Sequence, residues 1–442
     1  MSRLKKYKIV TYGCQMNLHE SEKLAGILSD LSYVETEKEE DADIIVFNTC
    51  CIRENAENHA EGNIGALKKL KKANKNLIIA VGGCMSQQKG FAEKFHKSFP
   101  YVDIIFGTHN LENFKDLLLK KLSSKKSVIE VLDKEGAVIE GTPKLRTSFP
   151  NAWVNITYGC NNFCSYCIVP YVRGRERSRR EEDIINECKE LIGQGYKEIT
   201  LLGQNVNSYG KDLNNTDFAT LIRKISNLEG DFRLAFMTNH PKDFNEDLIR
   251  ALSESNKVCK RVHLPVQAGS NRILKLMNRH YTREDYLTTV NLLRSYIPDV
   301  SITTDIMVGF PTETDEDFLD TFNLVKEVGF AGAFTFIYSR RKGTPAAEMD
   351  GQIDEKVSKE RIMKLIDYQN EFNRQESKKY LNKIITILCE GYDEKKDKYL
   401  GRDTYGRMAY FSSKTNLVGQ FVEVKITQTG GISLLGEMVE GK

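Results

Sequence analysis

Three cysteines crowded into one short segment are the strongest chemical signal in the chain. Cys160, Cys164 and Cys167 form a Cys-x3-Cys-x2-Cys pattern directly after residues 153–157, which read as a buried strand. Three thiolates this close at the end of a barrel strand can hold three irons of a 4Fe–4S cluster and leave the fourth iron open. Zinc is an alternative, but a closed zinc site needs four ligands, and no fourth Cys or His lies nearby in the sequence. The spacing predicts an iron–sulfur cluster; chance loop cysteines are the other alternative.

Three further cysteines are spread over the first part of the chain, one after each predicted strand. Cys14, Cys50 and Cys84 follow the first, second and third strands. The carboxyl ends of adjacent parallel strands share one edge of a sheet, so these thiols can converge there on a second metal site. Three buried structural cysteines are the alternative. Cys51 adds an ambiguity, because neighbouring residues at a strand end point in different directions and only one can readily join a site.

The elements that must position these cysteines begin with alternating strands and helices. In the first 120 residues, short apolar runs alternate with amphipathic stretches, which predicts a parallel sheet covered by helices. A polar stretch at 123–147 then reads as a connector. The predicted strands are 8–12, 43–49, 77–81 and 102–106, and the predicted helices are 21–31, 54–72, 87–95 and 110–122.

The middle of the chain repeats a strand–helix unit six times, which predicts a partial, open (β/α)6 barrel. After it, five short strands separated by Gly, Asn and charged turns predict a small closed β-barrel of the OB type. We therefore expect an α/β protein with three domains, at residues 1–145, 146–377 and 378–442. The six barrel strands are expected at 153–157, 198–202, 233–237, 262–266, 301–308 and 333–338, and the five later strands at 383–389, 399–402, 408–411, 421–426 and 434–438.

Composition is that of an ordinary globular protein. The 442 residues are 40% hydrophobic and 28% charged, and the length suggests roughly three domains. No apolar run approaches the roughly 20 residues that a membrane-spanning helix needs. The basic N-terminus is followed by an apolar stretch that breaks at Gly13 and Cys14, which does not fit a secretory signal. We expect a cytoplasmic protein whose ten cysteines include metal ligands rather than disulfides.

Basic residues are concentrated in two places on a chain whose formal net charge is only +3. Residues 173–180 hold five arginines and one acid, and residues 378–442 are also basic. Both regions suit local contact with an anionic substrate, and solvated surface charge is the alternative. Arg173, Arg175 and Arg177 can hold phosphates, because a guanidinium fork matches their geometry.

The cysteine segment and its surroundings resemble the radical S-adenosylmethionine (SAM) superfamily, whose signature is Cys-x3-Cys-x-aromatic-Cys, here with Tyr166 as the aromatic residue. Within that superfamily the chain resembles the methylthiotransferase family over essentially its whole length. The matching motifs include residues 13–17 (GCQMN), 48–53 (NTCCIR), 83–85 (GCM), 166–178, 202–207, 263–270, 304–313 and 338–346, and a terminal domain like TRAM.

The resemblance implies an activity, two cofactor types and a division of labour. It implies methylthiolation of C2 of N6-isopentenyladenosine at position 37 of tRNA. It implies two 4Fe–4S clusters, one on Cys160, Cys164 and Cys167 that cleaves SAM to a 5′-deoxyadenosyl radical, and an auxiliary one that holds the sulfur to be methylated and donated. The auxiliary ligands would be Cys14, Cys50 and Cys84, with Cys51 a bystander.

Residues at the ends of other barrel strands are candidates for the cofactor pocket, with ordinary loop chemistry as the alternative. Close backbone approach and amide hydrogen bonding are the contacts they can make. In the terminal domain, aromatic residues interleaved with Arg402 and Arg407 can stack on unpaired bases, and the alternative is that they form the core of the small barrel. The pocket candidates are Tyr166, Gly203, Gln204, Gln267, Asp305 and Gly309, and the aromatic set is Tyr399, Tyr405, Tyr410 and Phe411.

Three rival functions share parts of this pattern. Methylthiolation of threonylcarbamoyl adenosine uses the same chemistry on a different base, and a ribosomal-protein methylthiotransferase lacks the Gln-Met-Asn and Ile-Arg signatures. A redox-sensing iron–sulfur RNA-binding protein is the non-enzyme alternative. The expected partners are the anticodon stem-loop of tRNA, an electron donor such as a flavodoxin or ferredoxin, and a sulfur donor. We expect no membrane partner and a monomer.

Overall fold

The computed structural model describes residues 3–51, 54–134, 136 and 138–439. They form two compact units. The first comprises Met1–Thr147, Thr157–Phe163 and Cys167–Arg179, and the second comprises Ser148–Ile156, Cys164–Tyr166 and Arg180–Lys442. Within the described part of the chain, no helix is both long and apolar enough to cross a membrane.

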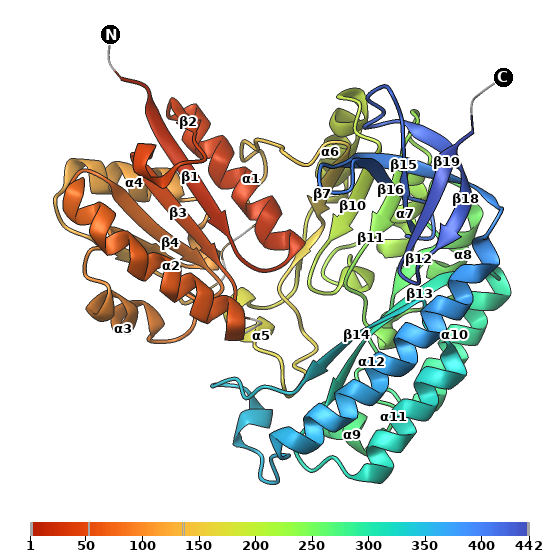
Figure 1. Ribbon diagram of the computed structural model, residues 1–442. Coiled ribbons are helices and arrows are strands. Elements are labelled where there is room, and N and C mark those ends of the chain that lie inside the picture. The colour runs from red at the N-terminus through yellow and green to blue at the C-terminus, as the bar shows by residue number, and fades with distance from the viewer. Residues whose placement is uncertain (1–2, 52–53, 135, 137, 440–442) are drawn as a thin grey trace. The chain divides into compact units, whose positions relative to one another are not determined.

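The first unit is built on a six-stranded sheet in the order β2-β1-β3-β4-β5-β6, and every pairing in it is parallel. Successive residues of each strand face opposite sides of the sheet. One side packs on α1 and α4, and the other side packs on α2 and α3. The predicted parallel sheet covered by helices is confirmed (Figure 1). Its elements are β1 (Lys5–Thr11), β2 (Tyr33–Glu35), β3 (Ile44–Thr49), β4 (Ile78–Gly83), β5 (Ile104–Phe106) and β6 (Val128–Glu130), with α1 (Gln15–Asp30), α2 (Glu54–Ala73), α3 (Phe91–Ser98) and α4 (Phe114–Ser123).

Helix α1 differs most from its prediction, because it begins directly after Cys14 rather than at residue 21. Its first turns carry Asn17, His19 and Glu20, which are polar in sequence yet buried in the structure. Because these first residues are polar, their composition gave no sign that the helix begins before residue 21. The edge strands β2 and β6 were not predicted, since three residues are too few to show an alternating pattern. Strand β6 lies inside the predicted connector.

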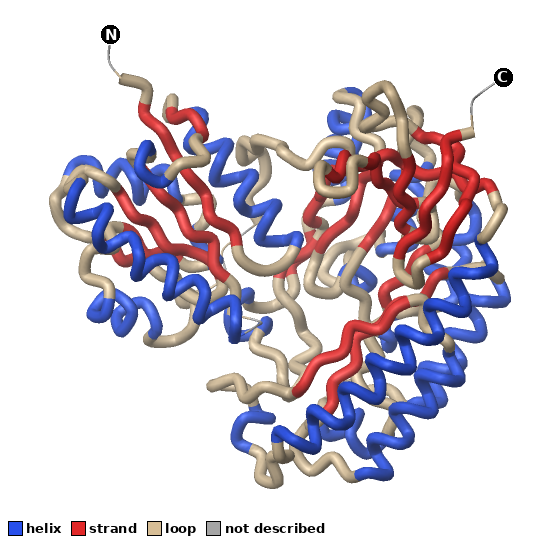
Figure 2. The backbone as a smooth tube through the Cα atoms, viewed as in Figure 1, coloured by secondary structure: helices blue, strands red, loops and turns tan. Residues whose placement is uncertain are grey.

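The second unit contains the predicted partial barrel, with all six strands observed. They form two parallel three-stranded sheets, β11-β10-β7 and β12-β13-β14, which a parallel bridge between Leu234 and Val258 connects. In Figure 2 the strands lie inside the helices that follow them. The strands are β7 (Asn151–Asn155), β10 (Glu198–Leu202), β11 (Arg233–Phe236), β12 (Arg261–His263), β13 (Ser301–Val308) and β14 (Gly332–Ile337), and the main helices are α6 (Glu181–Gly193), α7 (Phe218–Ser226), α8 (Glu246–Glu254), α10 (Arg283–Tyr296), α11 (Asp315–Val328) and α12 (Glu355–Ser377).

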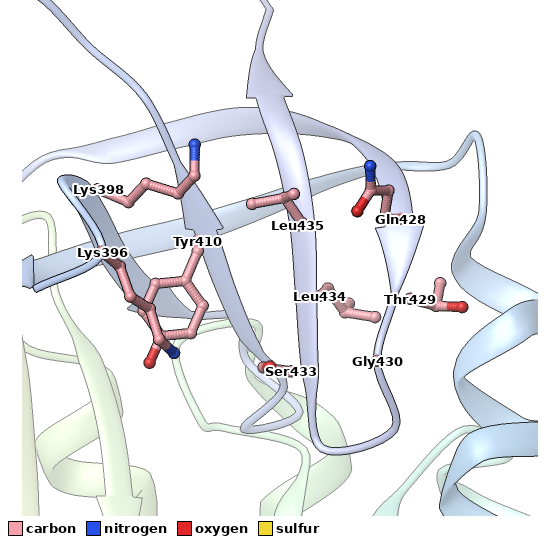
Figure 3. Close-up of a pocket in the computed structure, with 9 residues that line it drawn as sticks. All are labelled: Lys396, Lys398, Tyr410, Gln428, Thr429, Gly430, Ser433, Leu434 and Leu435. Atoms are coloured by element: carbon pink, nitrogen blue, oxygen red, sulfur yellow. The ribbon is translucent and has the colours of Figure 1, made fainter.

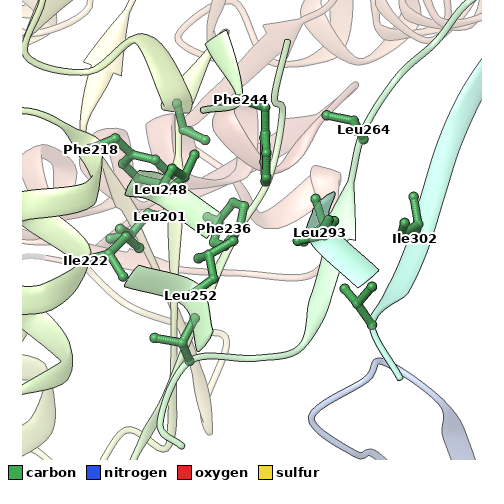
Figure 4. Packing of buried hydrophobic residues seen from close by; sticks show 14 of the residues in the cluster. Leu201, Phe218, Ile222, Phe236, Phe244, Leu248, Leu252, Leu264, Leu293 and Ile302 are labelled. Carbon is green, nitrogen blue, oxygen red and sulfur yellow. The ribbon is translucent and has the colours of Figure 1, made fainter. Parts of the chain in front are cut away.

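The barrel core lies between the strands and these outer helices (Figure 4). Leu201 and Phe236 come from neighbouring strands and meet Ile222 of α7 and Leu252 of α8, all of them buried. Burial of each such side chain stabilises the fold by about 1.5–3 kcal/mol. This packing holds the carboxyl ends of the strands at fixed positions, which is what a site built on those ends requires.

The C-terminal part is a closed five-stranded barrel in the order β15-β16-β17-β19-β18, as the sequence predicts. Its core includes Ile387, Cys389 and Phe411. Cys389 is buried, as are Cys188 and Cys259 in the larger barrel. The strands are β15 (Ile384–Asp393), β16 (Lys398–Arg402), β17 (Met408–Phe411), β18 (Phe421–Thr429) and β19 (Ser433–Met438).

A buried network of charges joins the two barrels of the second unit. Arg233, the first residue of β11, binds Glu198 through Nε and Glu390 of β15 through Nη2 at 3.1 Å. Its Nη1 donates to the carbonyl of Arg402 at 2.6 Å, and Arg261 of β12 also binds Glu198 at 2.7 Å. The side chains of Arg233, Glu198 and Glu390 are all buried. The network lies at the amino ends of the strands, away from the ends that carry the candidate cofactor residues.

Candidate functional site

The cysteines of the first unit follow strands that end side by side. The last residue pair of the β3–β4 ladder is Thr49 with Gly83, and the amide of Cys84 donates to the carbonyl of Thr49 at 3.0 Å. Strand β1 pairs with the other side of β3 and ends three residues before Cys14. Cys50 and Cys84 are buried, and Cys14 is partly exposed. The predicted positions of all three cysteines at one sheet edge therefore agree with the topology.

Gly13 and Asn17, which lie on either side of Cys14 in the sequence, fix the backbone at this edge of the sheet. Gly13 has φ +109°, and a Cβ atom there would lie 2.8 Å from Sγ of Cys50, so a side chain at this position would collide with the cysteine. Asn17, in the first turn of α1, donates to the carbonyl of Thr49 at 3.0 Å and accepts a weak hydrogen bond from Cys14 at 3.8 Å. These contacts fix the start of α1, and with it Cys14, to the end of β3.

Cys51 lies against Cys84. The hydrogen bond from Cys51 lowers the pKa of the Cys84 thiol; burial raises it, the charge of Arg173 lowers it, and the net shift is downward. The same hydrogen bond and burial raise the pKa of Cys51. The Cys51 thiol is therefore the donor of this hydrogen bond, and the Cys84 sulfur is its acceptor. The choice of Cys50 over Cys51 as a ligand stays a prediction. Residues 52 and 53, the end of the 48–53 motif, lie outside the described residues.

Arg173 is placed where a phosphate contact is not possible, so that prediction is wrong for this residue. It is the last residue of α5 (Val169–Arg173), and only 5% of it is exposed. Its Nη2 donates to Oδ1 of Asn17 at 2.9 Å and to Oε2 of Glu20 at 3.1 Å, and its Nη1 pairs with the other oxygen of Glu20. Its partners are distant in sequence, which is why composition alone placed it with the exposed arginines.

Arg175 and Arg177 are more accessible than Arg173. Arg175 is exposed, with its guanidinium 4.5 Å from the ring centre of Phe163. Arg177 is partly exposed and donates to the carbonyl of Gly136. For these two residues a phosphate contact stays a prediction.

The loop carrying Cys160 is anchored by a close approach of two chain segments. Gly159 has φ +75°, and a Cβ atom there would lie 2.1 Å from the carbonyl oxygen of Arg175. The amide of Cys160 donates to the carbonyl of Gly174 at 3.2 Å. Nearby, β8 (Thr157–Tyr158) pairs antiparallel with β9 (Arg177–Ser178). The glycine is therefore a steric requirement of the turn that presents Cys160.

Cys164 contacts a buried arginine that the sequence did not single out. Nη1 of Arg279 lies 3.4 Å from Sγ of Cys164 and 3.5 Å from the hydroxyl of Tyr166, and Nη2 donates to the carbonyl of Pro265 at 2.8 Å. Burial alone lowers the pKa of Arg279, but the neighbouring Tyr281, Tyr166 and Cys164 outweigh it and raise the pKa well above its usual range. Its position depends on long-range packing, and no local motif marks it.

Cys167 is partly exposed, unlike Cys160 and Cys164, which are buried. Among the described residues, no three or more His, Cys, Asp and Glu side chains are arranged to hold a metal ion. The cysteines of both sets therefore stay predicted ligands. The placement of one set at strand ends and of the other in one short loop supports the prediction.

Most of the predicted cofactor-pocket residues of the barrel lie at or just beyond strand ends, but Asp305 lies in the middle of β13. Gly203 and Gln204 directly follow β10. Gln267 has φ +72° and continues the ladder beyond β12, its amide donating to the carbonyl of Asp305 at 2.8 Å. Gly309 follows β13, but its close neighbour is Ser358 of α12, which a Cβ atom would meet at 2.2 Å. The structure therefore shows Gly309 packed against helix α12.

Buried polar atoms near the same strand ends lack partners. Oδ1 of Asn205, Oδ1 of Asn239 and Nε2 of His240 have no hydrogen-bond partner among the described residues. Asn205 follows β10, and the other two follow β11. Burial and the charge of Arg279 lower the pKa of His240, so its ring is neutral at ordinary pH. Buried polar atoms are normally satisfied, so these atoms fit a site that receives a polar ligand. Sequence analysis missed all three.

The small barrel carries a surface pocket of about 370 Å³ (Figure 3). Lys396 and Tyr410 form one wall, with Nζ of the lysine 3.8 Å from the ring centre. Lys398 lies beside them, and Gln428 and Leu435 come from β18 and β19. Two lysines beside the partly exposed ring of Tyr410 suit a nucleotide, because the lysines can bind its phosphate while the ring stacks on its base. Lys396 and Lys398 were not among the predicted RNA-binding residues.

The aromatic set is divided between the core and the surface. Phe411 is fully buried and Tyr399 packs against the core, so base stacking is wrong for Phe411. Tyr410 and Tyr405 are partly exposed. Adjacent strand residues point to opposite faces, which is why Tyr410 and Phe411 differ.

The two predicted RNA-binding arginines of the small barrel are both paired with acids. Arg402 binds Glu390, and Arg407 binds Asp403 at 2.8 Å while lying over the rings of Tyr380 and Tyr405. Their RNA contacts stay predictions.

Three family models match parts of the chain. Residues 154–325 match the model of the radical SAM superfamily, residues 6–107 that of uncharacterized protein family UPF0004, and residues 378–439 that of the TRAM domain. The fold of a radical S-adenosylmethionine methyltransferase, TsrM, from Kitasatospora setae is similar, with a TM-score of 0.58 over 78% of this chain and 77% of that one at 14% identity. The cobalamin-dependent SAM radical enzyme OxsB has a TM-score of 0.52, over 84% of this chain and 56% of its own.

Sequence relatives are much closer. A protein of Clostridium perfringens named tRNA-2-methylthio-N(6)-dimethylallyladenosine synthase is 54% identical over 99% of this chain and 98% of its own length. One of the same name from Clostridium tetani is 54% identical over 98% of this chain and 96% of its own. Identity at this level over almost the whole length of both chains shows the family. The chain belongs to the tRNA-2-methylthio-N(6)-dimethylallyladenosine synthases, a family of radical SAM enzymes.

Proposed function

We propose that this enzyme methylthiolates C2 of N6-isopentenyladenosine at position 37 of tRNA, giving the 2-methylthio derivative. The observation that carries the proposal is the placement of Cys14, Cys50 and Cys84 after three adjacent strands of one sheet, beside family identity over the whole chain. Three parts would divide the work: residues 1–145 for sulfur supply, 146–377 for radical chemistry and 378–442 for RNA binding. Cytoplasmic location and a monomeric state belong to the same proposal.

An iron–sulfur cluster and SAM are the cofactors of a radical SAM enzyme, and the residues present fit them. Cys160, Cys164 and Cys167 would hold one 4Fe–4S cluster and leave one iron for SAM. Cys14, Cys50 and Cys84 would hold a second, auxiliary cluster. When bound, these groups supply the one-electron chemistry that activates a C–H bond, for which acid–base side chains alone are insufficient.

The chain's own residues would bind and orient these groups. The orphaned acceptors of Asn205 and Asn239 can receive hydrogen bonds from the amino and hydroxyl groups of SAM. Arg279 places a positive charge beside Cys164 and Tyr166. Gln204 and Gln267 would line the same strand ends, Asp305 would contribute from within β13, and Gly203 would allow close backbone approach. Burial of Asn205, Asn239 and Arg279 limits water around a reactive radical.

Substrate RNA would be held by basic and aromatic groups outside the cysteine sites. The pocket formed by Lys396, Lys398 and Tyr410 supports RNA binding by the small barrel, and Arg175 remains a candidate phosphate contact. An electron donor such as a flavodoxin or ferredoxin and a sulfur donor complete the proposed partners, since the reaction consumes electrons and sulfur.

The two clusters can be tested separately. Replacing Cys160, Cys164 and Cys167 together with Ala should leave roughly half of the iron and sulfide and abolish SAM cleavage. The triple replacement of Cys14, Cys50 and Cys84 should retain cleavage to 5′-deoxyadenosine but stop thiolation. Methylthio product from either triple variant would contradict the proposal.

Substrate choice tests the subfamily. An isopentenyl group needs an apolar pocket, whereas a threonylcarbamoyl group needs partners for its carboxylate, whose unpaired burial would cost several kcal/mol. We expect product with isopentenyladenosine anticodon stem-loops and little with threonylcarbamoyl or unmodified ones, measured by mass spectrometry of nucleosides. Preferential thiolation of the threonylcarbamoyl RNA, or of a ribosomal peptide alone, would overturn the proposed substrate.

A further inference from the structure

Arg173 is a buried cation among the residues that present the cysteines of the first unit. Its side chain is 6% exposed, as is that of its partner Glu20. Oδ1 of Asn17 accepts a hydrogen bond from Nη2 of Arg173 at 2.9 Å and a weak one from Sγ of Cys14 at 3.8 Å. The Arg173 guanidinium also lowers the pKa of the Cys84 thiol. A buried guanidinium in contact with a cysteine and a carboxylate serves neither RNA binding nor surface solubility, so it needs another explanation.

We propose that Arg173 is a positioning residue that balances the negative charge of the auxiliary cluster on Cys14, Cys50 and Cys84. This inference rests on the proposed function, since it needs a cluster at these cysteines. Thiolate ligands bring negative charge into a site with little water, and a fixed cation beside a ligand sulfur offsets it. Charge and hydrogen bonding to the sulfurs are also what set the reduction potential of an iron–sulfur cluster.

The partners of Arg173 explain why an arginine suits this position. Glu20 accepts from both Nη atoms, and Asn17 accepts a second bond from Nη2. Asn17 and Glu20 are three residues apart on α1, so they lie on one face of the helix. Asn17 also binds the end of β3. The planar fork is thereby fixed in orientation, which a flexible lysine would achieve less well.

The arrangement predicts that replacing Arg173 and replacing Glu20 shift the midpoint potential of the auxiliary cluster in opposite directions. Removing the positive charge of Arg173 disfavours the more negative, reduced state of the cluster, so the midpoint potential should become more negative. Removing the negative charge of Glu20 should make it less negative. A purely structural role would give no such reversal of sign.

The test uses full-length protein in which Cys160, Cys164 and Cys167 are replaced by Ala, so that only the auxiliary cluster remains. Arg173→Gln, Arg173→Lys and Glu20→Gln are made in this background. Arg146→Gln is the matched control, because Arg146 and Glu22 form a second buried ion pair on α1, at 2.7 Å. Iron and sulfide per chain are measured first, then the midpoint potential by EPR-monitored redox titration.

We expect a more negative potential in Arg173→Gln, a potential near that of the parent in Arg173→Lys, a less negative one in Glu20→Gln and a smaller shift in Arg146→Gln. Loss of iron from Arg173→Gln with retention in Arg173→Lys also supports the proposal, since the lysine keeps the charge. Equal potentials in the Arg173→Gln and Arg146→Gln proteins, or equal loss of iron from both Arg173 variants, would overturn it. A background protein that binds no iron would instead refute the auxiliary cluster itself.

Discussion

Nη1 of Arg279 lies 3.4 Å from Sγ of Cys164, so a buried cation touches one of the three predicted ligands of the radical cluster. The same guanidinium binds the carbonyl of Pro265 just beyond β12, which links the cysteine loop to the mouth of the barrel. Neighbours of this kind orient ligands and typically change metal affinity or activity 10–100-fold when removed.

Replacing Arg279 with Gln should therefore lower SAM cleavage by about tenfold or more, because the charge beside Cys164 is lost. The measurement is 5′-deoxyadenosine formed by the reduced enzyme, together with iron per chain. Arg294→Gln is the control, since Arg294 is a partly buried arginine of α10 that donates to the carbonyl of Val328. Equal cleavage by the two variants would show that Arg279 has no role at the radical site.

Cys50 and Cys51 can be distinguished by single replacements. In the background without Cys160, Cys164 and Cys167, Cys50→Ser should lose the remaining iron, whereas Cys51→Ser should keep it, because Cys51 would serve only as a hydrogen-bond donor to Cys84. Iron and sulfide analysis gives the answer. The reverse result would make Cys51 the ligand and Cys50 the bystander.

The Arg233 network predicts a large stability effect from one residue. Arg233→Met leaves the buried carboxylates of Glu198 and Glu390 with one partner fewer each, which should cost about 3–5 kcal/mol. The control is Lys197→Met, which removes a pair with Asp231, whose side chain is 73% exposed, and should cost at most about 1 kcal/mol. Thermal unfolding measures both; similar midpoints for the two variants would count against the network.

The fold was predictable where a local pattern carried the information. Strands β10 and β13 were predicted with their observed bounds. Strand β10 is a largely apolar run that is buried throughout, and β13 alternates buried with partly exposed residues. The edge strands β2 and β6 were not, because three residues show no period. The partner of Arg173 lies far away in sequence and that of Arg402 lies on the neighbouring strand, so arginine-rich composition could not distinguish an ion pair from a phosphate contact.

Candidate ligands were predictable for the same reason, and their surroundings were not. A Cys-x3-Cys-x2-Cys pattern is local, and one cysteine after each parallel strand follows from topology. Arg279, Asn239 and His240 reach the barrel mouth only through tertiary packing. Individually, each looks like an ordinary polar loop residue.

Asp317 should make stability depend on pH in the acid range. Burial alone raises the pKa of this carboxyl group, but hydrogen bonds from Arg272, Ser270 and Thr314 outweigh it and hold the pKa well below its usual value. The folded pKa lies below the unfolded value of about 3.9, so the contribution is fully present above that pH. It is lost as the pH falls from about 4 toward the folded pKa.

Asp317→Asn should therefore lower the unfolding midpoint at neutral pH, because the charge that pairs with Arg272 is lost, and the difference from the parent should shrink near pH 3. Asp315→Asn is the control, because Asp315 is 91% exposed although it pairs with Arg361. A difference that stays constant between neutral and acid pH would refute the role of the Asp317 carboxylate.

The pocket of the small barrel predicts a separable electrostatic and stacking contribution to tRNA binding. Lys396→Gln with Lys398→Gln should weaken binding and reduce the slope of log K against log salt by about 0.7–0.9 for each lysine that contacts a phosphate. Tyr410→Leu should cost about 1–3 kcal/mol if a base stacks on its ring, and should leave the salt slope unchanged.

Exposed Lys378 and Lys379, replaced by Gln, are the matched control, since they already bond to Gln375 and Glu376 of α12. Fluorescence anisotropy of a labelled tRNA over a salt series measures all three. Equal slopes for the two lysine pairs would show that the pocket does not face the RNA, because a pair that neutralises phosphates must release more counterions than one that does not.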